Sequence, residues 1–506
     1  MKTNVLCYLE DSAKRVPDKC AVRDERTALT YAELHEYSRR IGTALLPNVD
    51  VGEPVGVYLE QSARSLCAFF GVVHAGGFYS VLNVQLPAGR LGQMADVLEP
   101  KVILTSEDLM ERAAELFPGR HLLTLEQLLE TEPDDEALAL VRARCIDTQP
   151  LYLNFTSGST GIPKGIVVGH RSTLDFIEVF TERFGITEDD VLANQAPFDF
   201  DVSVKDIYSC LKTGATLVVV PRRFFTAPTD LMDFLCDQQI TTMVWAVSAL
   251  CLLTTFHAFE YRTPGTLRKI LFSGEVLPAK ALKALRTHLP DAMLVNLYGP
   301  TEITCNCTYH ILEPERDYTA GIPIGKAFPN EDVFLLDKND QKITGPDQVG
   351  ELCVRGTALA LGYYRNPEQT AKAFVQNPLN HDYPERIYRT GDLARFDRTG
   401  DLFFCGRKDF QIKYLGHRVE LEEIEREMGA IAGVERCCCV FEEARQRLKG
   451  FYVGQVPPEA LHAQMREKLP VYMVPGSLRR VPAMPLTKNG KIDRRTLETI
   501  GEEAIL

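Results

Sequence analysis

The stretch LNFTSGSTGIPKGI, residues Leu153 to Ile166, joins a short apolar run to a loop rich in hydroxyl groups and glycine. Runs that are apolar on both faces are typical of buried parallel strands, and ligands bind at the sheet edge where such strands end. Backbone N–H groups and hydroxyls of such a loop can cradle a di- or triphosphate. The stretch therefore predicts an α/β fold with an anion-binding loop.

The loop matches neither of two familiar motifs. A Walker loop needs a hydroxyl residue directly after its lysine, whereas Lys164 follows Pro163 and precedes Gly165. A nucleophile elbow needs glycine two residues away on both sides of a serine, and neither Ser157 nor Ser159 has this pattern. A structural Ser/Thr/Gly turn stays open as the alternative.

Further along the chain, strand-like and helix-like patterns alternate from about residue 50 to 300, as in KILFSG followed by PAKALKALRTHL. This alternation predicts α/β architecture with parallel sheets. From about residue 320, short segments such as GIPIG, DVFLLD and GELCVRG predict a small β-rich subdomain. The last ~95 residues predict a separate α+β lid, in which Leu421, Ile424 and Met428 share one helical face.

Composition narrows the function classes. The 506 residues carry 56 basic and 69 acidic side chains, a net charge of −13, which argues against an electrostatic grip on nucleic acid or on a membrane. The apolar run Met243 to Leu253 is shorter than the about 20 residues that a transmembrane helix needs. The N-terminus lacks a signal-peptide core, and 14 scattered cysteines include no C-x-x-C pair. We therefore expect a cytoplasmic protein with reduced thiols.

Three more stretches carry chemistry. In NLYGPTEITCN, Tyr298 offers a ring face to a nucleobase, and the Glu302 carboxylate suits Mg²⁺. In YRTGDLARFDRTGDLFFCGRKDFQIK, Asp392 can accept both ribose hydroxyls, with Arg407 close by in sequence. In PLTKNGKIDRR, Lys491 lies on a glycine turn. Each stretch alone has a plain alternative as a turn or a solvated charge.

Together, in order and spacing, the four stretches resemble the core motifs of the adenylate-forming superfamily, which includes acyl-CoA synthetases, luciferases and nonribosomal-peptide adenylation domains. LTYAEL, HAGGFYSVLNVQLPAGR, GIPIGKAFPN and GELCVRGTALALGYY also match that pattern. The resemblance implies a large N-terminal domain, residues 1–408, with two parallel-sheet α/β subdomains and a small β-barrel subdomain. It also implies a mobile α+β lid domain, residues 409–506, with a hinge at Asp409.

The resemblance implies a reaction in two halves. A carboxylate first attacks the α-phosphate of Mg-ATP, and Lys491 bridges the two anions. A thiol then displaces AMP after the lid swings and brings in Lys413 and Gly416. The implied Mg²⁺ ligand is Glu302. The implied ATP-binding residues are Thr156, Ser157, Gly158, Ser159, Thr160, Gly161, Lys164, Gly274, Glu275, Asn296, Tyr298, Gly299, Thr301, Asp392 and Arg407.

The stretch APFDFDVSVKDIYSCLKTGATLVVV bears on the acid that is activated. It resembles the fourth core motif of amino-acid-activating members, which implies that Asp201 holds the substrate's α-ammonium. The alternative is that Asp199 or Asp206 takes this role and Asp201 caps the following helix. The implied substrate pocket comprises Asp201, Val202, Lys205, Ala246, Leu271, Ser273, Leu297, Cys305 and Asn306, beside Lys491.

Two features of this pocket point to different substrates. Leu271, Ser273 and Leu297 imply room for a small side chain such as that of alanine, serine or cysteine. The similarity of FSGEVLP and FDFDVSVKDIY to free-standing D-alanine–D-alanyl carrier protein ligases agrees, although that subfamily usually has cysteine where Ser273 stands. An inward Lys205 would instead favour an acidic amino acid. We expect it to lie outward, because an unpaired buried ammonium is costly.

Only 15 residues follow Lys491. We therefore expect the thiol to belong to the phosphopantetheine of a separate carrier protein. A CoA ligase for a small carboxylic acid, and a catalytically silent binding protein, are the alternative functions. The stereochemistry of the substrate and the identity of the carrier stay open.

Overall fold

The computed structural model describes residues 2–158, 162–486 and 492–499, which form two compact units. The first unit comprises the chain up to Val84, Val97–Asn154 and Gly165–Lys408. The second comprises Gln85–Asp96, Phe155–Lys164 and the chain from Asp409 onward. The phosphate-loop stretch predicted from the sequence therefore falls in the second unit, together with the C-terminal segment.

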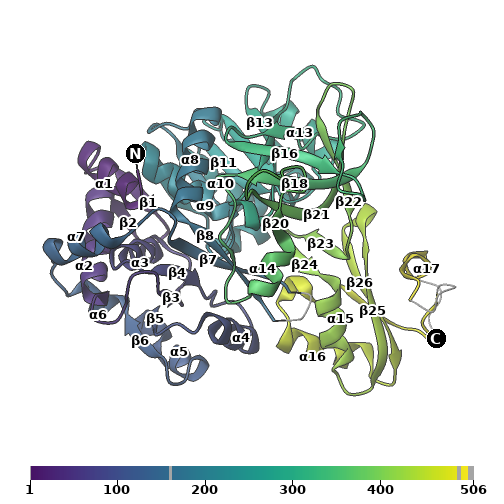
Figure 1. Ribbon diagram of the computed structural model, residues 1–506, viewed down its shortest axis with the longest axis horizontal. Coiled ribbons are helices and arrows are strands. Elements are labelled where there is room, and N and C mark those ends of the chain that lie inside the picture. Colours follow the sequence, from purple (N-terminus) through teal and green to yellow (C-terminus); the bar gives the residue numbers. More distant parts are fainter. Residues whose placement is uncertain (1, 159–161, 487–491, 500–506) are drawn as a thin grey trace. The chain divides into compact units, whose positions relative to one another are not determined.

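The largest sheet of the first unit has parallel strands at its centre and antiparallel strands at both edges (Figure 1). Its nine strands, in spatial order, are β15 (Lys326–Ala327), β14 (Thr308–Ile311), β13 (Met293–Tyr298), β12 (Lys269–Ser273), β11 (Thr242–Ala246), β9 (Val191–Asn194), β10 (Thr216–Val219), β1 (Cys20–Arg23) and β2 (Ala28–Thr30). The parallel pairing confirms the α/β prediction.

A second sheet pairs strands from the N-terminal part of the chain. Its seven strands, in spatial order, are β19 (Gly362–Tyr363), β8 (Lys164–Gly169), β7 (Pro150–Thr156), β4 (Phe78–Val81), β3 (Pro54–Val57), β5 (Val102–Thr105) and β6 (His121–Thr124). The pairs β4–β7, β3–β4, β3–β5 and β5–β6 are parallel. The opening stretch thus begins on a strand inside a parallel sheet, as its apolar pattern predicts.

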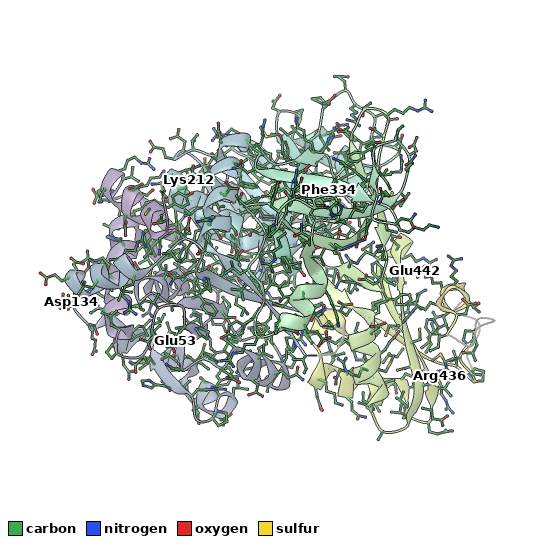
Figure 2. All side chains as sticks on the ribbon, in the orientation of Figure 1. Glu53, Asp134, Lys212, Phe334, Arg436 and Glu442 are labelled. Carbon is green, nitrogen blue, oxygen red and sulfur yellow. The ribbon has the colours of Figure 1, made fainter. Side chains whose placement is uncertain are left out.

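The β-rich part of the first unit is an antiparallel sheet that confirms the change of pattern near residue 320. Its strands are β17 (Lys342–Ile343), β16 (Glu331–Leu336), β18 (Gly350–Gly356), β21 (Arg386–Phe396), β20 (Phe374–Gln376) and β22 (Leu402–Arg407). Phe334, labelled in Figure 2, packs with Leu336, Cys353 and Ile387 in a core of their own. The segment GIPIG is not a strand; only Gly325 forms an isolated bridge, with Leu402.

The helices of the first unit pack on these sheets or on one another. They are α1 (Leu6–Arg15), α2 (Tyr31–Leu45), α3 (Ala63–His74), α5 (Met110–Leu116), α6 (Leu125–Leu129), α7 (Asp135–Arg144), α8 (His170–Phe184), α9 (Val202–Thr213), α10 (Pro228–Asp237), α11 (Val247–Thr255), α12 (Ala258–Tyr261), α13 (Ala279–His288) and α14 (Pro367–Ala373); α4 (Ala88–Leu98) begins in the second unit. No helix of the described residues is long and apolar enough to span a membrane.

The second unit has its own hydrophobic side chains, and successive residues of one strand belong to two different clusters. Its three-stranded sheet comprises β25 (Val434–Glu442), β26 (Arg447–Gly454) and β27 (Ser477–Arg480). Cys439 packs with α15 (Leu421–Gly429) and α16 (Pro458–Lys468), whereas the neighbouring Cys438 packs with α17 (Arg494–Thr499). The helices therefore cover opposite faces of the sheet, as Figure 1 shows. Leu421, Ile424 and Met428 all belong to the same hydrophobic cluster as Cys439, which confirms the predicted helical face.

Candidate functional site

Three of the pocket residues expected from the sequence lie in one row at the carboxyl edge of the central sheet. Ala246 of β11 is in register with Ser273 of β12, and Ser273 is in register with Leu297 of β13. Leu271 lies two residues before Ser273, so its side chain points to the same face. Small and aliphatic side chains thus form one wall beside the strand ends.

Helix α9 packs on that face and carries the two charged residues of interest. Its apolar side chains Val204 and Ile207 belong to the same core as Leu271 and Leu297. Asp201 is the N-cap residue, but its side chain makes no capping hydrogen bond. The helix ends at Gly214, whose positive φ of 79° suits glycine. Asp201 is therefore a half-buried residue at the N-terminus of a helix whose residues from Ser203 to Leu211 are buried.

The other two aspartates of the motif have amide partners. Asn83 Nδ2 donates to Asp199 at 3.0 Å, and Asn194 Nδ2 donates to Asp206 at 2.9 Å. Burial raises the pKa of Asp199 to about 6 and that of Asp206 to about 8. Each of these two carboxylates therefore already accepts a hydrogen bond from an amide side chain of the fold.

Lys205 lies inward, so the expectation that it points to solvent is wrong. Its side chain is 1% exposed, and its Nζ donates to Asn306 Oδ1 at 2.7 Å. The expectation rested on the free-energy cost of burying an ammonium, which is known for any lysine. The sequence does not show that the side of α9 with Lys205 packs against the loop after β13. Two residues of the expected pocket, 101 positions apart, are thus in direct contact.

The loop after β13 owes its shape to close backbone packing. Thr304 and Cys305 both have positive φ, 51° and 76°, which is uncommon for residues with a side chain. A Cβ on Gly299 would stand 2.5 Å from the Cα of Asn306, so only glycine fits there. Cys305 Sγ lies 3.1 Å from the Asp201 carbonyl. These constraints fix Cys305 and Asn306 against the start of α9.

A second group joins β13 to the β-rich sheet. The buried Asp392 of β21 accepts a hydrogen bond from the Tyr298 hydroxyl and forms an ion pair with Arg407, which is its register partner on β22. Burial and the nearby Asp392 carboxylate raise the pKa of Tyr298 well above its usual value. Asn296, one of the expected nucleotide-binding residues, donates from Nδ2 to the Pro323 carbonyl at 2.9 Å. The carboxylate of Asp392 is therefore held in one orientation.

Glu302, the expected metal ligand, lies in the short helix η3 (Thr301–Ile303) and is 1% exposed. Its Oε1 accepts a hydrogen bond from Tyr363 at 2.8 Å. No group of three or more His, Cys, Asp or Glu side chains that suits a metal ion occurs among the described residues. A single carboxylate fits Mg²⁺ only when phosphate oxygens supply further ligands, which is how this ion commonly binds in nucleotide sites.

In the second unit, residues on either side of the loop contact the C-terminal segment. Ser157 Oγ donates to the Arg418 carbonyl at 2.7 Å, and the Gly158 N–H donates to Glu423 Oε2 at 3.2 Å. Lys164 Nζ lies 3.8 Å from Glu420 Oε1. A Cβ on Gly158 would stand 2.2 Å from the Ile162 carbonyl oxygen, so no larger residue fits at this position. A carboxylate therefore occupies a backbone donor that was expected to bind phosphate.

The hairpin expected to carry the second half-reaction comprises β23 (Gln411–Tyr414) and β24 (His417–Glu420). Lys413 is half-buried on β23. Leu415 and Gly416 form the two-residue turn with positive φ at both positions, 51° and 80°, as a type I′ turn requires. Asp409 precedes the hairpin, and its Oδ1 accepts from the Gln411 N–H at 3.2 Å.

The remaining expected residues fall into two sets. Thr156, Val202, Gly274, Glu275 and Thr301 are half-buried, and Gly274 has a positive φ of 98°. Ser159, Thr160, Gly161 and Lys491 lie outside the described residues. Tyr363, Arg90 and Glu423 were not expected from the sequence, although the first two lie in quoted motifs; nothing in their spacing shows which charged or polar group each one contacts.

The chain matches known families along most of its length. Residues 9–364 match the family described as AMP-binding enzyme, and residues 423–491 match the AMP-binding enzyme C-terminal domain. The chain is 31% identical to a D-alanine–D-alanyl carrier protein ligase of Listeria monocytogenes over 99% of both proteins. It is 34% identical to tyrocidine synthase 3 of Brevibacillus parabrevis over 96% of its own length, but spans only 7% of that protein.

A solved structure has the same fold. It is a nonribosomal peptide synthetase (NRPS) protein containing adenylation and PCP domains, bound to a vinylsulfonamide inhibitor. The similarity extends over 98% of this chain and 84% of that one, with a TM-score of 0.83 and 27% identity. On the family match and the full-length relative, the chain belongs to the AMP-binding enzyme family, and it is an adenylate-forming ligase.

Proposed function

We propose that this enzyme activates an amino acid with ATP and transfers the aminoacyl group to the phosphopantetheine thiol of a separate carrier protein. The observation that carries the proposal is the half-buried Asp201 at the N-terminus of α9, a helix that shares its hydrophobic core with Leu297 of the row Ala246, Ser273 and Leu297. A carboxylate next to an apolar wall suits an α-ammonium group. The names of the relatives, a D-alanine–D-alanyl carrier protein ligase and NRPS proteins, support this reading.

In the first half-reaction, a substrate carboxylate oxygen attacks the α-phosphorus of ATP, and the bond to the bridging oxygen breaks to release pyrophosphate. Asp392, held by Tyr298 and Arg407, accepts hydrogen bonds from the ribose hydroxyls. Mg²⁺ bound at Glu302 would neutralise charge on the phosphates. Lys491 bridges the attacking carboxylate and the α-phosphate in this proposal, and the 156–164 loop binds the leaving pyrophosphate.

In the second half-reaction, the carrier thiolate attacks the acyl carbon, the tetrahedral intermediate collapses, and the bond from that carbon to the AMP oxygen breaks. The β23–β24 hairpin with Lys413 and Gly416 serves this step after rotation about Asp409. The boundary between the two units, directly before Asp409, supports the hinge position.

Amino-acid-dependent exchange between ATP and labelled pyrophosphate tests the first half. The panel comprises the twenty common amino acids and D-alanine, with acetate and propionate as acids that lack an amine. Exchange with an amino acid supports the proposal, whereas exchange only with amine-free acids replaces it with the acyl-CoA ligase alternative. Transfer of the labelled amino acid to a phosphopantetheinylated carrier, compared with CoA, then tests the second half.

A further inference from the structure

Lys205 is a buried cation whose hydrogen-bonding capacity is mostly unused. An ammonium group has three N–H donors, and here one of them reaches the neutral Asn306 Oδ1 at 2.7 Å. Within the described part of the chain, Lys205 forms no ion pair with a carboxylate. Burial without a paired anion is costly, so this side chain is unusual for a purely structural residue.

The nearby acidic groups do not cancel the charge. Asp201 and Asp206 on α9, and Cys305 on the loop after β13, are the titratable groups that act on Lys205, and each favours its charged form. Burial nevertheless lowers the pKa of Lys205 overall. Burial raises the pKa of Asp206 to about 8, and its Oδ2 accepts a hydrogen bond from Asn194 rather than from Lys205. Asp201 is the aspartate that the proposed function assigns to the substrate's ammonium.

The spacing of Asp201 and Lys205 limits the size of an amino acid that contacts both side chains. Asp201 and Lys205 are four residues apart and so lie on the same face of α9, about 5–6 Å apart at their Cβ atoms. Asp201 is half-buried, whereas Lys205 lies one turn deeper. An amino acid whose ammonium meets Asp201 therefore directs a short side chain toward Lys205.

We propose that Lys205, held by Asn306, selects an amino acid with a short acidic side chain of the aspartate or glutamate class. This inference rests on the proposed function, because it assumes an amino acid substrate at Asp201. The side-chain carboxylate would take the N–H donors that Asn306 leaves unused. A neutral substrate such as alanine would leave the ammonium buried without an anion. The row Ala246, Ser273 and Leu297 limits the length of the side chain.

The test compares selectivity in ATP–pyrophosphate exchange between the unmodified enzyme and two variants. Lys205→Met keeps an unbranched side chain, one heavy atom shorter, and removes the charge. Lys212→Met is the matched control, since Lys212 (labelled in Figure 2) lies on the same helix and pairs with Glu178 instead. Both enantiomers of aspartate, glutamate, alanine and serine are assayed, and thermal melting checks that each variant folds.

We expect the unmodified enzyme to prefer an acidic amino acid in kcat/KM. Lys205→Met should lose about tenfold to a hundredfold of that activity, the range for a hydrogen bond to a charged group, and should shift its preference toward neutral amino acids. Lys212→Met should keep the original preference. Should Lys205→Met not fold, the preference of the unmodified enzyme still decides.

Two results would overturn the inference without touching the proposed function. One is exchange by the unmodified enzyme that is as efficient with alanine or serine as with any acidic amino acid. The other is an equal loss with acidic and neutral amino acids in a folded Lys205→Met variant, which is the behaviour of a structural lysine. Absence of exchange with every amino acid would instead remove the proposed function itself, and the inference with it.

Discussion

Asp392 shows how one residue is prepared for a ligand. Tyr298 and Arg407 both contact its carboxylate, and the residue is 4% exposed. A carboxylate has about four acceptor positions, so contacts to these two partners leave capacity for ribose hydroxyls. The sequence suggested that an aspartate, Asp392, binds the ribose and that Arg407 lies near it. Tyr298 was expected to contribute only its ring to a nucleobase, not a hydrogen bond to Asp392.

Asp392→Asn should raise the KM for ATP by about tenfold to a hundredfold, because hydrogen bonds to a charged acceptor contribute about 1.5–3 kcal/mol. The replaced oxygen becomes an N–H₂ donor that faces Tyr298 or Arg407. Exchange assays at varied ATP concentration measure the effect. Asp347→Asn, which breaks a surface pair with Arg395, is the control. An unchanged KM in the Asp392 variant would show that this carboxylate does not bind the nucleotide.

Glu331 makes stability depend on pH. Its Oε1 accepts from the Ala358 N–H at 2.9 Å, its Oε2 is buried without a partner among the described residues, and burial with the nearby Asp175 raises its pKa to about 8. Between its usual pKa of 4.5 and about 8, the folded state holds a proton that the unfolded state has lost. Folding stability therefore falls as pH rises through this window.

Glu331→Gln should remove this contribution while keeping the acceptor for Ala358. We expect the melting temperature of the variant, relative to the unmodified enzyme, to increase steadily from pH 5 to pH 8.5. Calorimetry at several pH values measures the difference. A difference that is constant with pH would mean that Glu331 has an ordinary pKa in the folded protein.

At the scale of elements, Gly158, which follows β7, contacts helix α15. Glu423 of α15 accepts from the Gly158 N–H at 3.2 Å and pairs with Arg90 at 2.5 Å, where both side chains are buried. Burial raises the pKa of Glu423, and Arg90 opposes that effect. A phosphate that uses the Gly158 N–H must displace this carboxylate, so nucleotide and Glu423 compete for one donor.

Glu423→Gln should therefore lower the KM for ATP by about threefold to tenfold, since a neutral oxygen is a weaker competitor and repels phosphate less. Exchange kinetics at varied ATP concentration give the value. Glu425→Gln, on the same helix but paired with Arg494, is the control for altered charge on α15. A higher KM in Glu423→Gln than in the control would mean that Glu423 supports the nucleotide-binding state of the loop.

Elements were predictable where local pattern decides them, and contacts were not. The alternation of apolar runs predicted the parallel strands, and the spacing of Leu421, Ile424 and Met428 predicted α15. The inward position of Lys205 depends on a partner 101 residues away, and the Arg90–Glu423 pair joins residues 333 apart. Such contacts follow from how elements pack, which hydrophobic periodicity does not specify.

At the scale of the whole molecule, the two units divide the chain unequally. The second unit takes the C-terminal segment from Asp409 and two short pieces, Gln85–Asp96 and Phe155–Lys164, from far upstream. The loop proposed for pyrophosphate thus belongs by its contacts to the unit that carries Lys413. A rotation about Asp409 in the proposed mechanism therefore has two possible consequences for this loop. It breaks the hydrogen bonds from Ser157 to Arg418 and from Gly158 to Glu423, or it moves Ser157 and Gly158 together with the C-terminal segment.

Asp409→Pro tests that rotation. Proline fixes φ near −65°, so it limits the rotation while leaving the residues of both sites unchanged. We expect pyrophosphate exchange to stay within about twofold of the unmodified enzyme and thioester formation to slow by at least about tenfold, for a hinge whose motion is required only between the half-reactions. Single-turnover transfer from preformed aminoacyl-adenylate to the carrier measures the second step separately.

Asp409→Ala provides the matched comparison for this prediction. It loses the hydrogen bond from the Gln411 N–H but leaves φ free, so it should slow transfer less than proline does. Equal slowing by alanine and proline would assign the effect to that hydrogen bond. Equal loss of exchange and transfer in Asp409→Pro would contradict the hinge, because a restriction on rotation alone cannot impair a step that precedes it.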